Sequence, residues 1–329
     1  MRGVAQAQNQ FNQKGGLNGR LLQVAIANDD NEPRLAQQLA QELVKDSSVL
    51  AVIGNSSDAN KAALGEYEKS QLAIISPTSG INSLKDDFLF TTVPSDAVTG
   101  KTLAEYVGKK LGLNKVVVFF NSNSVYSDTL TNEFTKNFAQ FRGTVIRKIN
   151  LVETRLDVEK EVTNTLLKDQ AQAVVFFPDT QQTPAVLKIA TTNFQQTKRQ
   201  GLALLGGEAL YNKTTLTEGG KAVEGLIVVV PWFRDAPQSK NFAQAAAQQW
   251  KGQVSWRTAT SYDATQAFIK ALDSANPSRS TVLQRLLEVK LSSSETSGDS
   301  LQFTEGERLS QPVLVKVENG RFTLVRDQR

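Results

Sequence analysis

Short, almost wholly apolar runs separated by helical segments are the feature that most limits how this chain can fold. Val49–Ile53 and Leu72–Ile75 are two such runs, and the residues between them have the pattern of a helix. Runs of this kind are typical of parallel strands that are covered on both faces. A loop rich in Gly, Ser, Asn and Thr follows each run, and ligands of open α/β sheets bind at this end of the strands. The stretch 49–83 therefore predicts a strand–helix–strand unit whose loops suit a small anion.

The same alternation continues along the chain, stops near Pro94, starts again, and turns back near Pro231. A chain of 329 residues is also long enough for two domains of ordinary size. We therefore predict an α/β fold of two doubly wound, Rossmann-like lobes joined by three crossovers. We expect lobe 1 to comprise residues 1–94 and 235–309, and lobe 2 to comprise residues 95–234 and 310–329.

The remaining segments fit into these lobes. Leu21–Ala27 alternates in the manner of a strand, and Pro33 is well placed as the first residue of the next helix. Three helices are expected at about 237–251, 260–274 and 280–289. Three short strands follow, and Asn319–Gly320 predicts a hairpin turn between the last two.

Two residue types that the chain lacks exclude more classes of function than its overall composition does. The chain contains no His and no Cys, so it has none of the Ser–His or Cys–His dyads of hydrolases, no zinc site built from Cys or His, and no haem held by His or Cys. Its net charge of +4 comes without a dense run of Lys or Arg, so we expect no nucleic-acid partner. We predict a protein that is not an enzyme and that carries neither a cofactor nor a metal ion.

Taken together, the motifs resemble those of a known family. They occur in the order KGGLNGR (14–20), DDNEP (29–33), VIGNSSDA (52–59), IISPTSG (74–80), SVYSD (124–128), LLGGEALY (204–211), EGLIVVVPW (224–232) and TSYDATQAF (260–268). Over nearly its whole length the chain resembles the type I periplasmic binding proteins, and within them the branched-chain amino-acid-binding proteins of ABC importers. The resemblance implies a ligand site in the cleft between the two lobes.

The resemblance also implies site residues. The α-carboxylate of the ligand is expected at two loops of lobe 1, which match Ser56 and Ser57 in the first loop and Thr78–Gly80, including Ser79 and Gly80, in the second. The acid that holds the ammonium falls on Glu208, and an aromatic lid falls on Tyr126. Donors on one lobe and an acid on the other suit a zwitterion.

Three departures from the family pattern affect these assignments. The family has a serine four residues after the loop glycine, whereas here Asp58 stands four residues after Gly54 and Ser57 three, so either residue could face the ligand. Arg257 stands where small or aromatic residues are common, and it could bind a polar ligand side chain, pair with a carboxylate, or stack on Trp256. The family's first strand is absent from residues 1–329, so we expect a fragment of a longer exported protein or a misassigned start at Met1.

Other interpretations of the same residues remain open. The hydroxyl residues of the two loops could be ordinary helix caps or turn residues, and Glu208 could be a solvated acid. The glycine pairs at 15–16 and 206–207 complete no dinucleotide-binding or phosphate-binding motif. Asp29 and Asp30 begin a calcium-loop pattern that does not continue.

The sequence therefore predicts an extracytoplasmic, monomeric solute-binding protein that captures a free amino acid and delivers it to the permease subunits of an ABC importer. A sensing domain of a signalling receptor with the same fold is the alternative. The sequence does not specify which amino acid is bound.

Overall fold

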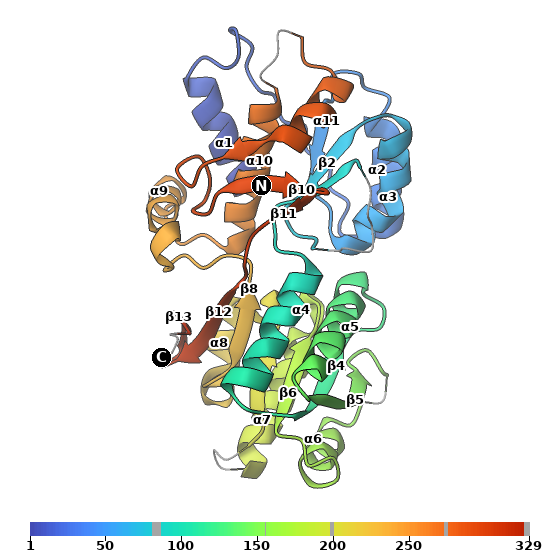
Figure 1. Ribbon diagram of the computed structural model, residues 1–329, viewed down its shortest axis with the longest axis vertical. Coiled ribbons are helices and arrows are strands. Elements are labelled where there is room, and N and C mark those ends of the chain that lie inside the picture. The colour runs from blue at the N-terminus through green and yellow to red at the C-terminus, as the bar shows by residue number, and fades with distance from the viewer. Residues whose placement is uncertain (81–86, 155, 198–200, 273–275, 326–329) are drawn as a thin grey trace. The chain divides into compact units, whose positions relative to one another are not determined.

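The computed structural model describes residues 1–80, 87–154, 156–197, 201–272 and 276–325 (Figure 1). By its internal contacts the chain divides into two compact units. Unit 1 comprises residues 1–95 and 232–311, and unit 2 comprises residues 96–231 and 312–329. Each unit is a largely parallel sheet flanked by helices, which confirms the predicted α/β class.

Unit 1 contains a six-stranded sheet in the order β1-β2-β3-β11-β10-β9. β1, β2, β3 and β11 are parallel, and β10 and β9 complete the sheet in antiparallel pairs. The strands are β1 (Ala51–Ile53), β2 (Ala73–Ser76), β3 (Leu89–Thr91), β9 (Lys290–Leu291), β10 (Leu301–Thr304) and β11 (Glu307–Arg308). The helices are α1 (Arg2–Gln13), α2 (Pro33–Leu43), α3 (Ser57–Lys69), α9 (Lys240–Trp250), α10 (Trp256–Ala271) and α11 (Arg279–Glu288).

Successive residues of a strand point to opposite faces, and both faces of this sheet are buried. Ile75 of β2 packs in a cluster with residues of α10 and α11, including Phe268 and Leu286. Ile74 lies in a different cluster, with residues of α2 and α3 such as Ala40. The continuous apolar character of β2 therefore follows from the helices that cover it on each side (Figure 1).

Unit 2 contains a seven-stranded sheet in the order β13-β12-β8-β7-β6-β4-β5. Its first five strands in the chain are parallel, whereas β12 and β13 are antiparallel. The strands are β4 (Lys115–Phe120), β5 (Thr144–Asn150), β6 (Ala173–Phe177), β7 (Ala203–Gly206), β8 (Ile227–Val230), β12 (Val313–Glu318) and β13 (Arg321–Leu324). The α-helices are α4 (Asp96–Glu105), α5 (Val125–Gln140), α6 (Val158–Leu167), α7 (Thr183–Thr197) and α8 (Lys213–Gly219).

Aromatic residues fill much of the core of unit 2. Phe134 of α5 stacks on Phe138, with ring centroids 5.2 Å apart, and meets Phe177 of β6 edge-on at 5.7 Å. On the other face of the sheet, the rings of Phe119 and Phe176 pack at 5.7 Å. These rings hold β4 and β6 side by side, so the loops after both strands start from a rigid base.

Most predicted elements are found within a few residues of their expected bounds. Pro33 does begin α2, and Asn319 and Gly320, both with positive φ, form the predicted hairpin turn. The predicted strand Leu21–Ala27 is wrong, because these residues pair with none of the described strands and are assigned to no element. The predicted helix at 260–274 begins earlier, at Trp256, and its last expected residues lie outside the described part of the chain.

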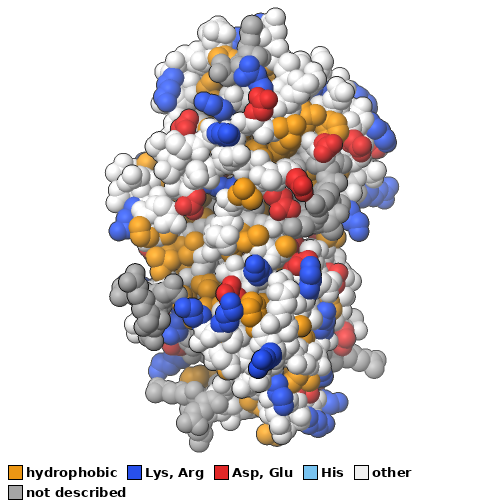
Figure 2. Space-filling model, viewed as in Figure 1, with side chains coloured by type: hydrophobic (Ala, Val, Ile, Leu, Met, Phe, Trp, Pro, Cys, Tyr) orange, Lys and Arg blue, Asp and Glu red, His pale blue; other side chains and the backbone are white. Residues whose placement is uncertain are grey.

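Among the described residues, no helix is both long enough and apolar enough to cross a membrane. Figure 2 shows Lys and Arg side chains scattered over the visible face, with Asp and Glu between them. The basic side chains on that face are not gathered into a single patch.

Candidate functional site

The loop after β1 places two serines at the start of a helix. Asn55 adopts a left-handed conformation with a φ of 65°, which Asn tolerates better than most residues. The chain then enters α3, and the side chain of Ser56 caps it by accepting a hydrogen bond from the Ala59 N–H at 3.4 Å. Ser57 is the first residue of α3 and is buried. The cap role that was open for the loop hydroxyls is thus filled by Ser56.

The loop after β2 is bonded to this first loop. The hydroxyls of Ser76 and Thr78 both donate to the carbonyl oxygen of Asn55, each at 3.0 Å. The hydroxyl of Ser57 donates to that of Ser79 at 3.0 Å, and Ser79 is fully buried. The structure therefore brings the predicted residues of the two loops together in one hydrogen-bonded group.

The hydroxyl of Ser79 can still donate a hydrogen bond. Because Ser79 accepts the Ser57 proton, it keeps its own hydroxyl hydrogen for a further acceptor. The first turn of α3 adds the positive end of a helix dipole beside it. Gly80, next to Ser79, is buried as well. Donors of this kind suit a carboxylate oxygen.

In unit 2, the two other predicted site residues are directly bonded. Tyr126 lies in the first turn of α5, after β4, and Glu208 follows β7 at the start of a single 3₁₀ turn. The Tyr126 hydroxyl donates to Glu208 Oε2 at 2.7 Å. Each side chain is only partly buried, so other groups can approach the pair. The structure thus joins the predicted acid to the predicted aromatic residue.

The environment keeps Tyr126 protonated. Burial raises the pKa of Tyr126 well above its usual value, and the negative charge of Glu208 and the hydrogen bond to it raise it further. Tyr126 therefore remains a donor to Glu208 throughout the physiological range.

Gly207 is required by this arrangement for reasons of space. A Cβ atom at position 207 would lie 2.4 Å from the Tyr126 hydroxyl oxygen, which is far closer than a van der Waals contact. The φ of Gly207 is −85°, so the need is for room and not for a special backbone conformation. The glycine before Glu208 thus lets the tyrosine reach the acid.

A second polar group at the same edge of the sheet was not predicted. Asp179, just after β6, accepts hydrogen bonds from Asn121 Nδ2 at 2.6 Å and from the hydroxyl of Ser124 at 2.9 Å. Ser124 also caps α5 by accepting a hydrogen bond from the Ser127 N–H. Glu208 was identified through the family resemblance. Its place just after a buried strand is a signal that Asn121 and Asp179 share, and this signal could have identified them.

Arg257 lies in the first turn of α10 and is exposed. Its guanidinium carbon lies 4.3 Å from the centroid of the Trp256 ring, so the stacking alternative is confirmed. Trp256 itself is buried, at 1% exposure. Stacking fixes the guanidinium near the start of α10 and leaves a ligand role for Arg257 as a prediction.

Among the described residues, no group of three or more Asp or Glu side chains is arranged to hold a metal ion. Asp29 and Asp30 instead close local turns, in which Asp29 accepts from the Asn31 N–H at 3.0 Å and Asp30 accepts from Asn28 Nδ2 at 2.7 Å. These turns explain the acidic pair without a calcium ion.

Two curated relatives are proteins named for the amino acids they bind. The leucine-, isoleucine-, valine-, threonine- and alanine-binding protein of Pseudomonas aeruginosa is 23% identical over 251 residues, covering 74% of this chain and 64% of the relative. The chain thus spans less than two thirds of that relative's length. The Leu/Ile/Val-binding protein of Escherichia coli is 23% identical over 279 residues, covering 82% of this chain and 74% of the relative.

Solved structures share the fold over almost the whole chain. A leucine-binding protein from Thermotoga maritima superposes with a TM-score of 0.85 at 21% identity, covering 99% of this chain and 92% of that one. A branched-chain amino-acid transporter substrate-binding protein from Streptococcus pneumoniae, in complex with isoleucine, gives a TM-score of 0.84 at 20% identity, covering 98% of this chain and 91% of that one. A solute-binding protein from R. palustris in complex with benzoate gives a TM-score of 0.82 at 15% identity, covering 98% of this chain and 90% of that one.

The sequence model of one family, described as periplasmic binding protein, matches residues 1–320. This match covers nearly all of the chain, and the chain belongs to the periplasmic binding protein family.

Proposed function

We propose that this chain is the solute-binding component of an ABC importer, and that it captures a free L-amino acid outside the cytoplasm. The observation that carries the proposal is the hydrogen bond from the Tyr126 hydroxyl to Glu208 Oε2, which holds a partly buried acid just after β7. In this proposal unit 1 supplies donors for the ligand carboxylate and unit 2 supplies the acid for its ammonium. The protein acts as a monomer, binds without catalysing a reaction, and releases its ligand to a permease.

The unit 1 half of the site explains why a carboxylate is favoured. The Ser57 hydroxyl donates to that of Ser79, and the Ser79 hydroxyl can in turn donate a hydrogen bond to a ligand oxygen. Hydrogen bonds to an ionised acceptor are about twice as strong as those between neutral groups. The partial positive charge at the start of α3 has the same preference.

The unit 2 half favours a cation. An ammonium beside Glu208 would gain a charge-assisted bond, whereas a ligand without one would cover the acid and add no cation to it. The relatives named for leucine, isoleucine and valine support this class of ligand. The structure solved with benzoate belongs to the same fold, so the fold alone does not require an ammonium.

The test compares three proteins in calorimetric titrations with L-leucine, L-isoleucine, L-valine and L-alanine. Glu208→Gln keeps the size of the side chain and removes its charge. Glu218→Gln is the matched control, because Glu218 is an exposed acid of α8 in the same unit. Glu208 is only partly buried, so we expect a loss of about 2 kcal/mol, or roughly 30-fold in Kd, at the lower end for a truncated charge pair.

The control should bind as the unchanged protein does. Equal affinity of the Glu208→Gln variant and the unchanged protein would contradict the role of Glu208. Failure of every amino acid to bind a folded, unchanged protein would contradict the proposed ligand class.

A further inference from the structure

One carboxylate of unit 2 holds both ends of the loop that carries Tyr126. Asp179, just after β6, accepts hydrogen bonds from Asn121 Nδ2 at 2.6 Å and from the Ser124 hydroxyl at 2.9 Å. Asn121 and Ser124 are the two ends of the loop between β4 and α5, and both are buried. Tyr126 stands two residues after Ser124, in the first turn of α5. Asp179 is therefore bonded to the loop from which Tyr126 reaches Glu208.

The bond to Asp179 also sets the direction of the Ser124 hydroxyl. A serine hydroxyl has one hydrogen to donate and two lone pairs to accept with. Ser124 donates its hydrogen to Asp179, so its lone pairs are left to accept from the Ser127 N–H at 3.4 Å, the bond that caps α5. The positive end of the α5 dipole also favours a carboxylate beside this first turn. The start of α5 is therefore stabilised through Asp179.

The place of Asp179 in the chain favours a different role. It precedes the 3₁₀ turn Thr180–Gln182 as the N-cap residue, where an aspartate usually accepts from an N–H of its own turn. In the part of the chain that the structure describes, its side chain makes no such cap. Both carboxylate oxygens accept from the loop after β4 instead. Capping of its own turn therefore does not explain the acid at this position.

The order of the strands explains why the loop has to be held in place. β6 lies between β4 and β7 in the sheet. Tyr126 starts from the loop after β4 and bonds to Glu208 after β7, so it bridges two strand spacings, or about 10 Å. The bond is 2.7 Å long, and a shift of the loop by about 1 Å would exceed the usual O–H···O range. A small displacement of the loop would therefore separate Tyr126 from Glu208.

We propose that Asp179 is a positioning residue of the amino-acid site, which fixes the loop 121–124 and the start of α5 so that the Tyr126 hydroxyl meets Glu208. The inference rests on the proposed function for the ligand, but not for the position of Tyr126. Burial and Glu208 raise the pKa of Tyr126 most, and the charges of Asp96 and Asp179 raise it further. Asp179 is thus close enough to act on the phenol.

The test needs variants that separate the charge of Asp179 from its hydrogen bonds. Asp179→Asn keeps the size of the side chain, but its amide oxygen can accept from only one of the two donors, and its NH₂ group faces the other. Adding Asn121→Asp restores the pair, because the amide at 179 then donates to the carboxylate at 121 and still accepts from Ser124. Asp179→Glu keeps the charge and displaces it by one methylene group. Asp128→Asn is the matched control, since Asp128 is an exposed acid in the first turn of α5.

The first readout contains no ligand. Tyrosines labelled with ¹³C at Cζ give resonances that depend on the hydrogen bonding of the hydroxyl, and the Tyr126→Phe variant identifies that of Tyr126. Glu208→Gln shows how this resonance moves when the charged acceptor is lost. We expect Asp179→Asn and Asp179→Glu to move it in the same direction. The exchanged pair of Asn121→Asp with Asp179→Asn should return it, and Asp128→Asn should leave it in place.

The second readout is the Kd for L-leucine in titration calorimetry. Asp179→Asn should raise this Kd about tenfold, as expected when a hydrogen bond to a charged group is lost. In the Tyr126→Phe background the same change should raise it less than about twofold, because there is no hydroxyl left to position. A merely structural role of Asp179 would weaken binding equally in both backgrounds.

A Tyr126 resonance that stays in place in every folded variant of Asp179 would overturn the proposal. Failure of the exchanged pair to return the resonance would overturn it as well, and so would equal losses of affinity with and without the Tyr126 hydroxyl. If no amino acid binds the unchanged protein, the proposed function fails, and the resonance alone decides whether Asp179 positions Tyr126.

Discussion

Two arginine–acid pairs with the same atomic separation should differ sharply in what they contribute to stability. Arg308 Nη1 lies 2.6 Å from Asp263 Oδ2 in unit 1, and the two side chains are 6% and 0% exposed. Arg147 lies 2.6 Å from both Glu161 and Asp169 in unit 2, but its side chain is 32% exposed. Solvent screens the second group and not the first.

Replacing Arg308 by Met leaves a buried carboxylate without its cation. Removing one partner of a buried pair costs about 3–5 kcal/mol. Asp263 keeps two donors in the variant, the N–H of Ser297 at 2.6 Å and its hydroxyl at 2.8 Å. We therefore expect about 3 kcal/mol, the lower end of this range. Arg147→Met should cost less than about 1 kcal/mol.

The assay is urea denaturation followed by circular dichroism, with the midpoint and the slope fitted separately. A change in midpoint at constant slope reports stability alone. The double variant Asp263→Asn with Arg308→Met should recover part of the loss, because a neutral amide no longer needs the cation. Equal costs for Arg308→Met and Arg147→Met would refute the argument that burial decides the contribution.

Three further predictions concern the site itself. Gly207→Ala should weaken amino-acid binding at least tenfold in titration calorimetry, because its Cβ would displace the Tyr126 hydroxyl from Glu208; affinity equal to that of the unchanged protein would contradict this. The pKa of Tyr126 is raised on folding, so above about pH 10 the unfolded chain loses this proton first and the free energy of unfolding falls as the pH rises. In denaturation series at increasing pH, the free energy of unfolding of the Tyr126→Phe variant should fall less steeply than that of the unchanged protein. An identical dependence on pH would contradict this prediction. Ser79→Ala removes the acceptor of the Ser57 hydroxyl and the donor offered to the ligand, so the binding free energy for leucine should weaken by about 1–2 kcal/mol in calorimetry. An unchanged Kd would contradict a role for these two hydroxyls in binding.

Most strands of both sheets could be predicted because burial leaves a strong local signal, but the two-residue strands β9 and β11 were not predicted. β2 (Ala73–Ser76) lies within one residue of the predicted strand Leu72–Ile75, since that run is apolar throughout. The order of strands across a sheet depends on pairings between distant segments, and no local pattern contains that order.

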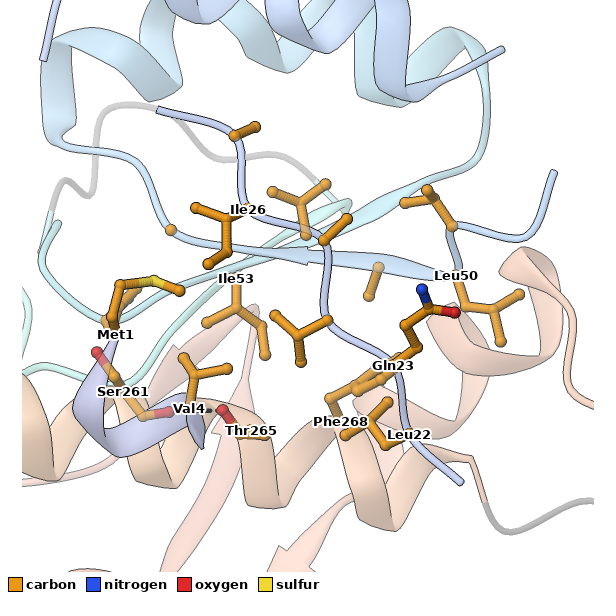
Figure 3. A pocket seen from close by; sticks show the side chains of 18 of the residues that line it. Met1, Val4, Leu22, Gln23, Ile26, Leu50, Ile53, Ser261, Thr265 and Phe268 are labelled. Carbon is orange, nitrogen blue, oxygen red and sulfur yellow. Dashed lines mark hydrogen bonds between the residues drawn. The ribbon is translucent and has the colours of Figure 1, made fainter. Parts of the chain in front are cut away.

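Leu21–Ala27 shows the limit of such patterns. Its alternation is typical of a strand, but a strand needs a neighbour, and the position beside it is an open groove (Figure 3). The bond between Tyr126 and Glu208 is similar, since 82 residues separate the two side chains in the chain. The sequence indicated each residue separately, and folding brings them together.

The most direct test of the proposed ligand class is whether the unchanged protein requires both charged ends of its ligand. Calorimetry would compare L-leucine with 4-methylpentanoate, which lacks only the ammonium, and with 3-methylbutylamine, which lacks only the carboxylate. We predict that each loss weakens binding by about 2 kcal/mol or more, roughly 30-fold in Kd. Binding of 4-methylpentanoate as tight as that of leucine would contradict the central role given to Glu208.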